Sequence, residues 1–131
     1  MIIETKTKKF TIELALEDRS IEIILNPVGK KTYKAIIDAY QSLLEIERKR
    51  IEALVDSEEN SVNKALTTMT LIVEEADVAL NALKNILEPN EWKKIEDIID
   101  LVPVETISKI LIAIAENMNE SFIDSLMEGK I

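Results

Sequence analysis

The chain has 131 residues, of which 47% are hydrophobic and 31% are charged, a composition typical of one folded domain. It contains no cysteine and no histidine, which excludes disulfides, thiolate chemistry and the most common general base at neutral pH. The net charge of -9 disfavours nucleic acid as a partner, because a phosphate backbone repels an acidic surface.

No continuous apolar stretch reaches the roughly 18 residues that span a membrane, so no membrane segment is expected. The first residues, Met1-Ile2-Ile3-Glu4, lack the basic head and apolar run of a signal peptide. Together these two observations predict a protein of the cytoplasm.

Two strands are predicted first along the chain. Residues 10–16 alternate between apolar and polar side chains, so that one face carries Phe10, Ile12, Leu14 and Leu16. Residues 20–25 are rich in β-branched side chains, and residues 17–19 are suited to a tight turn. The pattern predicts a β-hairpin, to which Ile2 and Ile3 offer a third strand. Pro27 and Gly29 end this region at residue 29.

Long helices are favoured after residue 30, where Gly129 is the only glycine and apolar side chains recur at spacings of three and four. The predicted helices run from about Thr32 to Val55, from about Ser61 to Leu87, from Glu91 to about Leu101, and from Pro103 onward. The last one has a bend or an interruption at residues 119–121 and continues at helical spacing to Met127. We therefore predict a single domain, 1–131, of the α+β class. It is mainly α, a bundle of about four helices with a small N-terminal β-hairpin.

The second predicted helix is apolar on more than one side. Its main stripe consists of Val62, Leu66, Met69, Val73, Ala76, Leu80, Leu83 and Leu87. A helix of this kind is covered by several neighbours or by a second copy of the protein. Self-association, as a homo-oligomer, is therefore expected.

Carboxylate clusters are the only candidates for chemistry. Glu74, Glu75 and Asp77 lie together, and a second acidic group follows at residues 96–100. The sequence has no calcium-loop spacing, no glycine-rich phosphate loop and no nucleophile-elbow pattern. A solvated polar face is the favoured interpretation. We expect no catalytic residue, no cofactor and no metal site.

The last predicted helix carries the main binding signal, because its apolar stripe continues past the point where a small bundle is complete. The candidate protein-binding residues are Ile107, Ile110, Leu111, Ile114, Met118, Phe122 and Leu126. Docking of this helix within its own domain is the more common alternative. The free edge of the β-hairpin is a second candidate surface. Trp92 suits either a core anchor or a binding hot spot. The core anchor is the favoured interpretation, because Trp92 shares helical spacing with Ile95.

The order of these parts is itself informative. The segment from Leu83 through Pro89 and Trp92 to Ile95 is followed by Ile98-Ile99-Asp100-Leu101-Val102-Pro103 and by a closing helix that contains Ile110-Leu111-Ile112-Ala113-Ile114-Ala115. This arrangement resembles the tail assembly chaperones of long-tailed phages and prophages of Gram-positive bacteria. The resemblance implies a protein that binds and solubilises the tape-measure protein and assists assembly of the tail tube. It also implies action in the host cytoplasm and absence from the mature virion.

Two other functions are compatible with the sequence. An acidic regulatory or adaptor protein, such as an inhibitor, an antitoxin or a nucleic-acid mimic, would use the net charge of -9 to bind a basic surface. Such binding weakens steeply with salt, whereas binding to an apolar groove does not. A carboxylate–metal enzyme is the least favoured, because the chain has no histidine.

Overall fold

The computed structural model describes residues 1–2, 9–26, 29–56 and 60–127, and describes side chains up to Met118. The elements are β1 (Phe10–Ala15), β2 (Ser20–Leu25), α1 (Lys30–Val55), α2 (Ser61–Ile86), α3 (Pro89–Ile98) and α4 (Val104–Met127). The predicted class, mainly α with a small N-terminal β-hairpin, is confirmed.

The β-hairpin forms as the alternation predicts. β1 and β2 are antiparallel, and the N–H of Leu16 donates to the carbonyl of Arg19 at 2.7 Å to close the turn. Leu14 is buried, and the other apolar residues of its face are half-buried against the core. Ile2 is exposed and lies outside the sheet, so it adds no third strand, while Ile3 and Pro27 fall outside the described residues.

The two long helices begin at different kinds of N-cap. Gly29 precedes α1 with an extended backbone, φ -82°, and no side chain caps the start of this helix. Asn60 caps α2 by accepting the N–H of Asn63 at 2.8 Å. A polar side chain satisfies an N–H that the helix itself leaves free, which explains why the break before Ser61 ends in asparagine.

The two later helices differ from prediction at their boundaries. α3 begins at Pro89, not Glu91, because proline at the first helical position needs no N–H partner and its φ suits a helix. α3 ends at Ile98, whose carbonyl accepts the N–H of Leu101 in a turn. α4 begins just after Pro103 and continues to Met127, so the predicted interruption at residues 119–121 is wrong.

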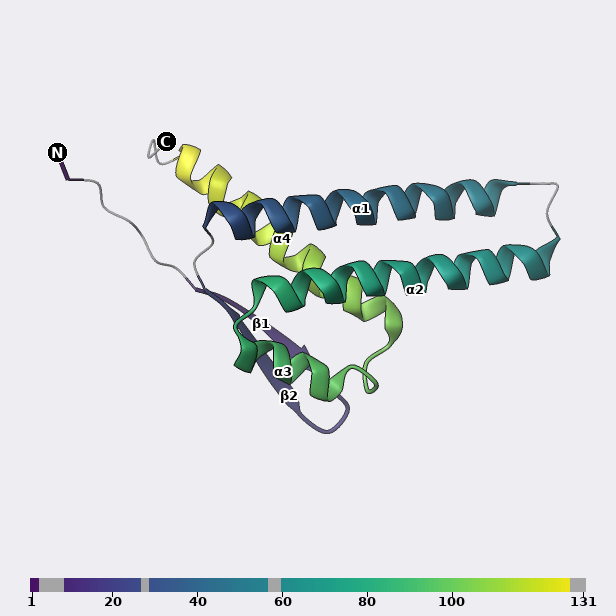
Figure 1. Ribbon diagram of the computed structural model, residues 1–131, viewed down its shortest axis with the longest axis horizontal. Coiled ribbons are helices and arrows are strands. Elements are labelled where there is room, and N and C mark those ends of the chain that lie inside the picture. The colour runs from purple at the N-terminus through teal and green to yellow at the C-terminus, as the bar shows by residue number, and fades with distance from the viewer. Residues whose placement is uncertain (3–8, 27–28, 57–59, 128–131) are drawn as a thin grey trace.

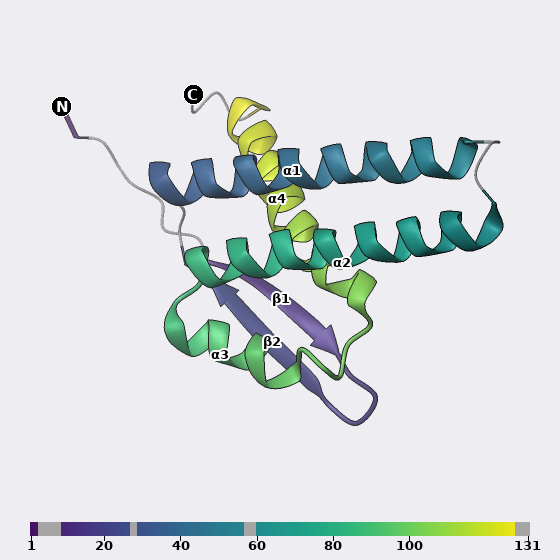
Figure 2. The ribbon, with the colours of Figure 1, turned by 45° about the vertical axis from the view of Figure 1, so that its right-hand side comes forward.

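The two strands, α3 and α4 gather at one end of a long helical hairpin made of α1 and α2 (Figure 1). The β-hairpin and α3 lie beside α2 on the side away from α1, and α4 crosses the helix pair (Figures 1 and 2). One apolar core takes side chains from all six elements. Its fully buried members include Ile23, Ile36, Leu83, Ile98, Leu111 and Ile114.

The far end of the helical hairpin projects beyond this cluster. We call residues 44–55 of α1 and 61–73 of α2 the distal half. α1 and α2 each have 26 residues, about 39 Å at 1.5 Å per residue, whereas α3 has only 10 residues. The short elements therefore cover only part of the long ones. Within the described residues, no helix combines the length and apolar character needed to cross a membrane.

Candidate protein-binding surface

The principal exposed apolar feature is a stripe on α2. Alternating steps of four and three residues connect Val62, Leu66, Met69, Val73, Ala76, Leu80, Leu83 and Leu87. This is the spacing of a coiled-coil seam, which places the seven residues from Val62 to Leu83 on one face of α2, and Leu87 follows as the C-cap residue just past the helix. The last four are buried or half-buried in the core beneath their neighbours, α4 among them. The first four are 66%, 57%, 61% and 52% exposed in the same order.

A second stripe follows α1. Its exposed members in the distal half are Leu44, Ile51, Leu54 and Val55. The steps from Leu44 to Ile51 and on to Leu54 are seven and three residues, which again place the side chains on one face. The buried Leu43 and Ile46 lie on an adjoining part of the helix surface from Leu44 and Ile51. The distal half therefore presents apolar side chains beyond those that join its two helices.

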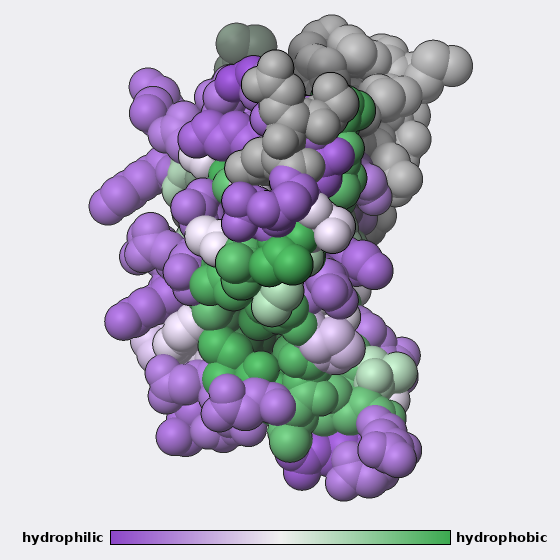
Figure 3. All heavy atoms as spheres, turned by 90° about the vertical axis from the view of Figure 1, so that its right-hand side faces the viewer, coloured by the Kyte–Doolittle hydropathy of each residue, from purple (hydrophilic) through white to green (hydrophobic). Residues whose placement is uncertain are grey.

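Figure 3 looks onto the loop end of the helical hairpin. Hydrophobic residues form a band that runs down this face of the molecule, and hydrophilic residues lie on both sides of it. An apolar band with a polar rim is a common form of a protein-binding surface, because the rim keeps the free protein dissolved while the band gains from burial.

A groove extends the α1 stripe towards the N-terminus of that helix. It lies between α1 and α4 and encloses about 460 Å³. Its lining includes Tyr33, Ile37, Tyr40, Leu44, Ala115 and Met118. Leu44 belongs both to this groove and to the distal stripe, so the two apolar surfaces are continuous along α1.

A charged pair lies within the seam of the helical hairpin. The guanidinium of Arg50 donates to Glu75 at 3.1 Å and to Glu47 at 2.9 Å. Burial raises the pKa of the Glu75 carboxyl above its ordinary value, and Arg50 offsets only part of this. Burial alone would lower the pKa of Arg50, but its two carboxylate partners raise it. The network fixes the pairing of α1 with α2 beside the apolar stripes.

The outer surface of α1 carries ion pairs of the ordinary helical type. Arg48 binds both Glu45 and Glu52, and the hydrogen bond from Arg48 lowers the pKa of Glu45. All three side chains are more than half exposed. Solvated pairs of this kind contribute little to stability, so they serve mainly to keep this surface polar.

The residues of α4 that were predicted to bind a partner fall into three groups in the structure. Ile107, Ile110, Leu111 and Ile114 are buried in the core, so the alternative of docking within the domain describes them. Met118 is half-buried and lines the groove beside α1. Phe122 and Leu126 lie on α4, beyond the part of the chain whose side chains are described.

The sequence did not identify the exposed stripes of the two long helices as the surface that binds a partner. The lengths of the elements give only part of the signal. α3 with 10 residues and two strands of 6 residues are too short to cover a helix of 26 residues, but α4 has 24 residues and leaves part of the stripe uncovered only because it crosses the helix pair (Figure 2). Periodicity alone places residues on a face, but it does not show which part of the face has a neighbour.

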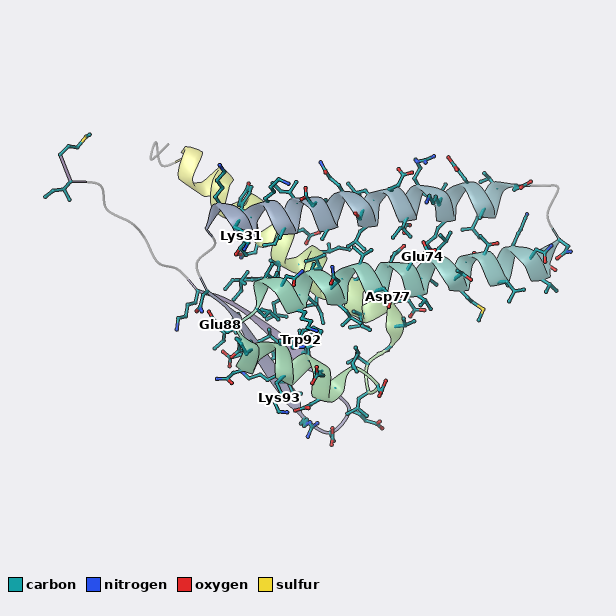
Figure 4. The ribbon with its side chains drawn as sticks, viewed as in Figure 1. Lys31, Glu74, Asp77, Glu88, Trp92 and Lys93 are labelled. Atoms are coloured by element: carbon teal, nitrogen blue, oxygen red, sulfur yellow. The ribbon has the colours of Figure 1, made fainter. Side chains whose placement is uncertain are left out.

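The acidic clusters do not converge on a site. Glu75 turns towards Arg50, whereas Glu74 and Asp77 are exposed on α2 (Figure 4). Within the described residues, no group of three acidic side chains is arranged to hold a metal ion. The carboxylates of this part of the chain therefore serve as partners of basic groups and as solvated surface.

Trp92 is half-buried against the core, and its indole Nε1 donates to Glu96 at 3.2 Å. It lies on the side of α3 nearer α2, whereas Lys93 lies on the opposite side (Figure 4). The prediction of a core anchor is confirmed for the ring, while its polar edge stays within reach of solvent.

Comparison of the chain with protein-family models, with curated proteins and with solved structures finds no match.

Proposed function

We propose that this protein is an assembly chaperone that binds apolar helical segments of another protein along the distal half of its helical hairpin. The observation that carries the proposal is the α2 stripe. Its second half packs within the protein against other elements, including a helix, and its first half offers the same spacing to solvent. A helix of a partner can bury that first half as a neighbouring helix buries a coiled-coil seam.

The particular class that we propose is the tail assembly chaperone of long-tailed phages. In this proposal the partner is the tape-measure protein, a long helical chain, and the bound chaperone assists assembly of the tail tube around it. The net charge of -9 supports such a role, because it keeps a complex with an apolar partner dissolved. The protein acts in the host cytoplasm and leaves before the virion matures. In the absence of its partner, the same apolar surface favours self-association.

Co-expression with a tape-measure protein, a long helical chain, tests the proposal. The expected result is that the partner becomes soluble and elutes together with this protein at high salt, because apolar contacts do not weaken with ionic strength. A complex that dissociates steeply as salt rises indicates the acidic regulatory protein instead. A partner that stays insoluble while this protein elutes alone contradicts the chaperone function.

Two pairs of substitutions assign the binding surface. Leu66→Gln with Val73→Gln removes two apolar side chains from the exposed stripe. Full burial of each is worth about 1.5–3 kcal/mol, and roughly half of this remains to be gained on binding because each is about half exposed, so affinity should fall at least about tenfold. Asn63→Gln with Thr70→Gln changes two exposed residues of the same helix outside the stripe and should leave affinity within about twofold. Equal affinities of the two variants would place the binding surface elsewhere.

A further inference from the structure

One edge of the two-stranded sheet is closed by side chains of α3. Glu91 accepts the N–H of Ile24 at 3.0 Å, and Lys94 donates to the carbonyl of Glu22 at 2.9 Å. Both backbone groups belong to β2 and face away from β1. A carboxylate and an ammonium group thus take the places that the carbonyl and the N–H of a third strand would occupy.

Among the described residues, nothing closes the opposite edge, on β1, in this way. Thr11 is paired with Ile24, and Glu13 is paired with Glu22. Because the backbone groups of Ile24 and Glu22 point away from β1, the backbone groups of Thr11 and Glu13 point away from β2. In an antiparallel pair both partners of such a residue pair turn their N–H and C=O away from the ladder. Ala15, two residues further along, does the same. All three residues are exposed, and their outward backbone groups accept or donate no hydrogen bond among the described residues.

The inner face of the sheet is covered unequally. On β2, Ile23 and Leu25 are only 1% and 5% exposed. On β1, Leu14 is buried, but Phe10 and Ile12 are only half-buried. The apolar face of the sheet is therefore incomplete on the side of β1, where another strand would extend it and bring its own apolar side chains.

The outer face of the sheet has an unbalanced charge. Glu13 and Glu22 are directly opposite each other as a non-hydrogen-bonded pair, the type in which side chains lie closest. Like charges in this position are destabilising. A lysine or arginine beside Glu13, on a strand added to β1, would relieve the repulsion.

We propose that the outer edge of β1 is a site of strand addition for an extended segment of a partner protein, in which basic residues alternate with apolar ones. The segment pairs antiparallel with residues 11–15. Its apolar side chains extend the inner face beside Ile12, and a basic side chain lies opposite Glu13. This site is separate from the helix-binding surface of the distal half and does not depend on that function. A second copy of the protein fits the edge less well, because it brings a further Glu13 and Glu22.

A blocked peptide about six residues long that alternates lysine and valine is the probe. On saturation it should slow hydrogen exchange of the amides of Thr11, Glu13 and Ala15 by at least about tenfold, with little change at Ile12 and Leu14, which already pair with β2. A peptide with glutamate in place of lysine should bind at least about tenfold more weakly. Equal binding of the two peptides, or no protection of the three amides, overturns the proposal.

Backbone methylation of the peptide provides a sharper control. Residues directly opposite each other share a face, so the lysines, not the valines, exchange hydrogen bonds with Glu13 and its outward neighbours. N-methylation of the lysine amides should abolish binding, and N-methylation of the valine amides should preserve it. The reverse result, or equal effects of the two modifications, overturns the pairing.

Substitution of the protein tests the same edge. Thr11→Pro removes an outward N–H while leaving the ladder with β2 intact. This substitution should lower the affinity for the lysine–valine peptide at least about tenfold. Thr11→Val retains the N–H and is the matched control, and circular dichroism of both variants checks the fold. Unchanged affinity of folded Thr11→Pro contradicts the proposal. The three amides could also be protected from exchange without peptide, in a dimer that forms at high protein concentration, and lose that protection in Thr11→Pro. This result would identify a second copy as the occupant of the edge and would likewise overturn the proposal.

Discussion

Arg50 of α1 and Glu75 of α2 form an ion pair of 3.1 Å across the seam of the helical hairpin, with the Glu75 side chain only 11% exposed. Glu47, which is half exposed, shares the same guanidinium. Burying the carboxylate of Glu75 costs free energy that Arg50 recovers only in part, because burial still raises the pKa of Glu75. The pair therefore specifies how the helices meet more than it stabilises them.

Removing Arg50 should be more harmful than removing its partner. Arg50→Gln leaves the Glu75 carboxylate buried without a cation and should lower the free energy of unfolding at pH 7 by about 2 kcal/mol. Glu75→Gln should cost less, about 1 kcal/mol, because Arg50 retains Glu47. Urea unfolding of the two variants measures both values, and a larger loss for Glu75→Gln would contradict this account of the seam.

The cost of Arg50→Gln should depend on pH. A carboxyl whose pKa is raised in the folded state destabilises the fold above that pKa, and the penalty disappears as the pH falls through it. Without Arg50 the pKa of Glu75 rises further, so the deficit should shrink between neutral pH and about pH 5. The double variant Arg50→Gln with Glu75→Gln lacks the titrating group and should show no such recovery.

Glu91 should stabilise the fold through the edge of β2. Burial works against its charge, but the N–H of Ile24 and the ammonium of Lys94 outweigh this and hold the pKa of Glu91 below its ordinary value of 4.5. Glu91→Gln should therefore lower the free energy of unfolding at pH 7 by about 1–2 kcal/mol. Glu88→Gln is the matched control. The carboxylate of Glu88 accepts the exposed amide of Asn26 at 3.2 Å, and the backbone carbonyl of Glu88 that begins α3 is retained in the variant. The substitution should therefore cost a few tenths of a kcal/mol, about the size of an exposed contact.

The contribution of Glu91 has the opposite pH dependence to that of Glu75. A lowered pKa gives stability that is present above 4.5 and is lost as the pH falls through the folded-state value. The difference between the natural protein and Glu91→Gln should therefore narrow below about pH 4.5. Unfolding curves that stay equally far apart at pH 3 and pH 7 would show that the hydrogen bond to Ile24 does not depend on the charge.

Gly29 is a position where the protein can be stabilised. Its backbone is extended, no side chain caps α1, and a Cβ at this position meets no atom within 4 Å. Gly29→Ser should supply a cap and reduce the freedom of the unfolded chain, raising the free energy of unfolding by about 0.5–1 kcal/mol. Calorimetry should show a Tm higher by a few degrees. A lower Tm would mean that the glycine serves another purpose.

The elements of this fold were predictable because each has a local cause. The period of two in residues 10–16 acts within a few residues of the chain, and the strand that it predicts is observed. The start of α3 was misplaced because Pro89 fits the first helical position as well as it fits a break. An interruption at residues 119–121 was expected, but α4 runs through them to Met127 because a polar run does not by itself end a helix.

The binding surface was less predictable because it depends on which neighbour covers each stripe. Leu66 of α2 and Leu111 of α4 are both leucines in an apolar helical stripe, yet one is 57% exposed and the other 0%. The difference arises from long-range packing of α4 against the proximal part of α2. The pairs Glu91–Ile24 and Lys94–Glu22 join residues about 70 positions apart and have no local signal either.

Truncation of these two leucines separates the core from the surface. Leu111→Ala opens a cavity among fully buried neighbours and should lower the free energy of unfolding by about 2–5 kcal/mol. Leu66→Ala removes atoms that are mostly in solvent, and its effect on stability should stay within about 0.5 kcal/mol. Urea unfolding measures both. If Leu111→Ala left stability unchanged, α4 would not be packed in the core, and the helix would again be the leading candidate for the partner surface.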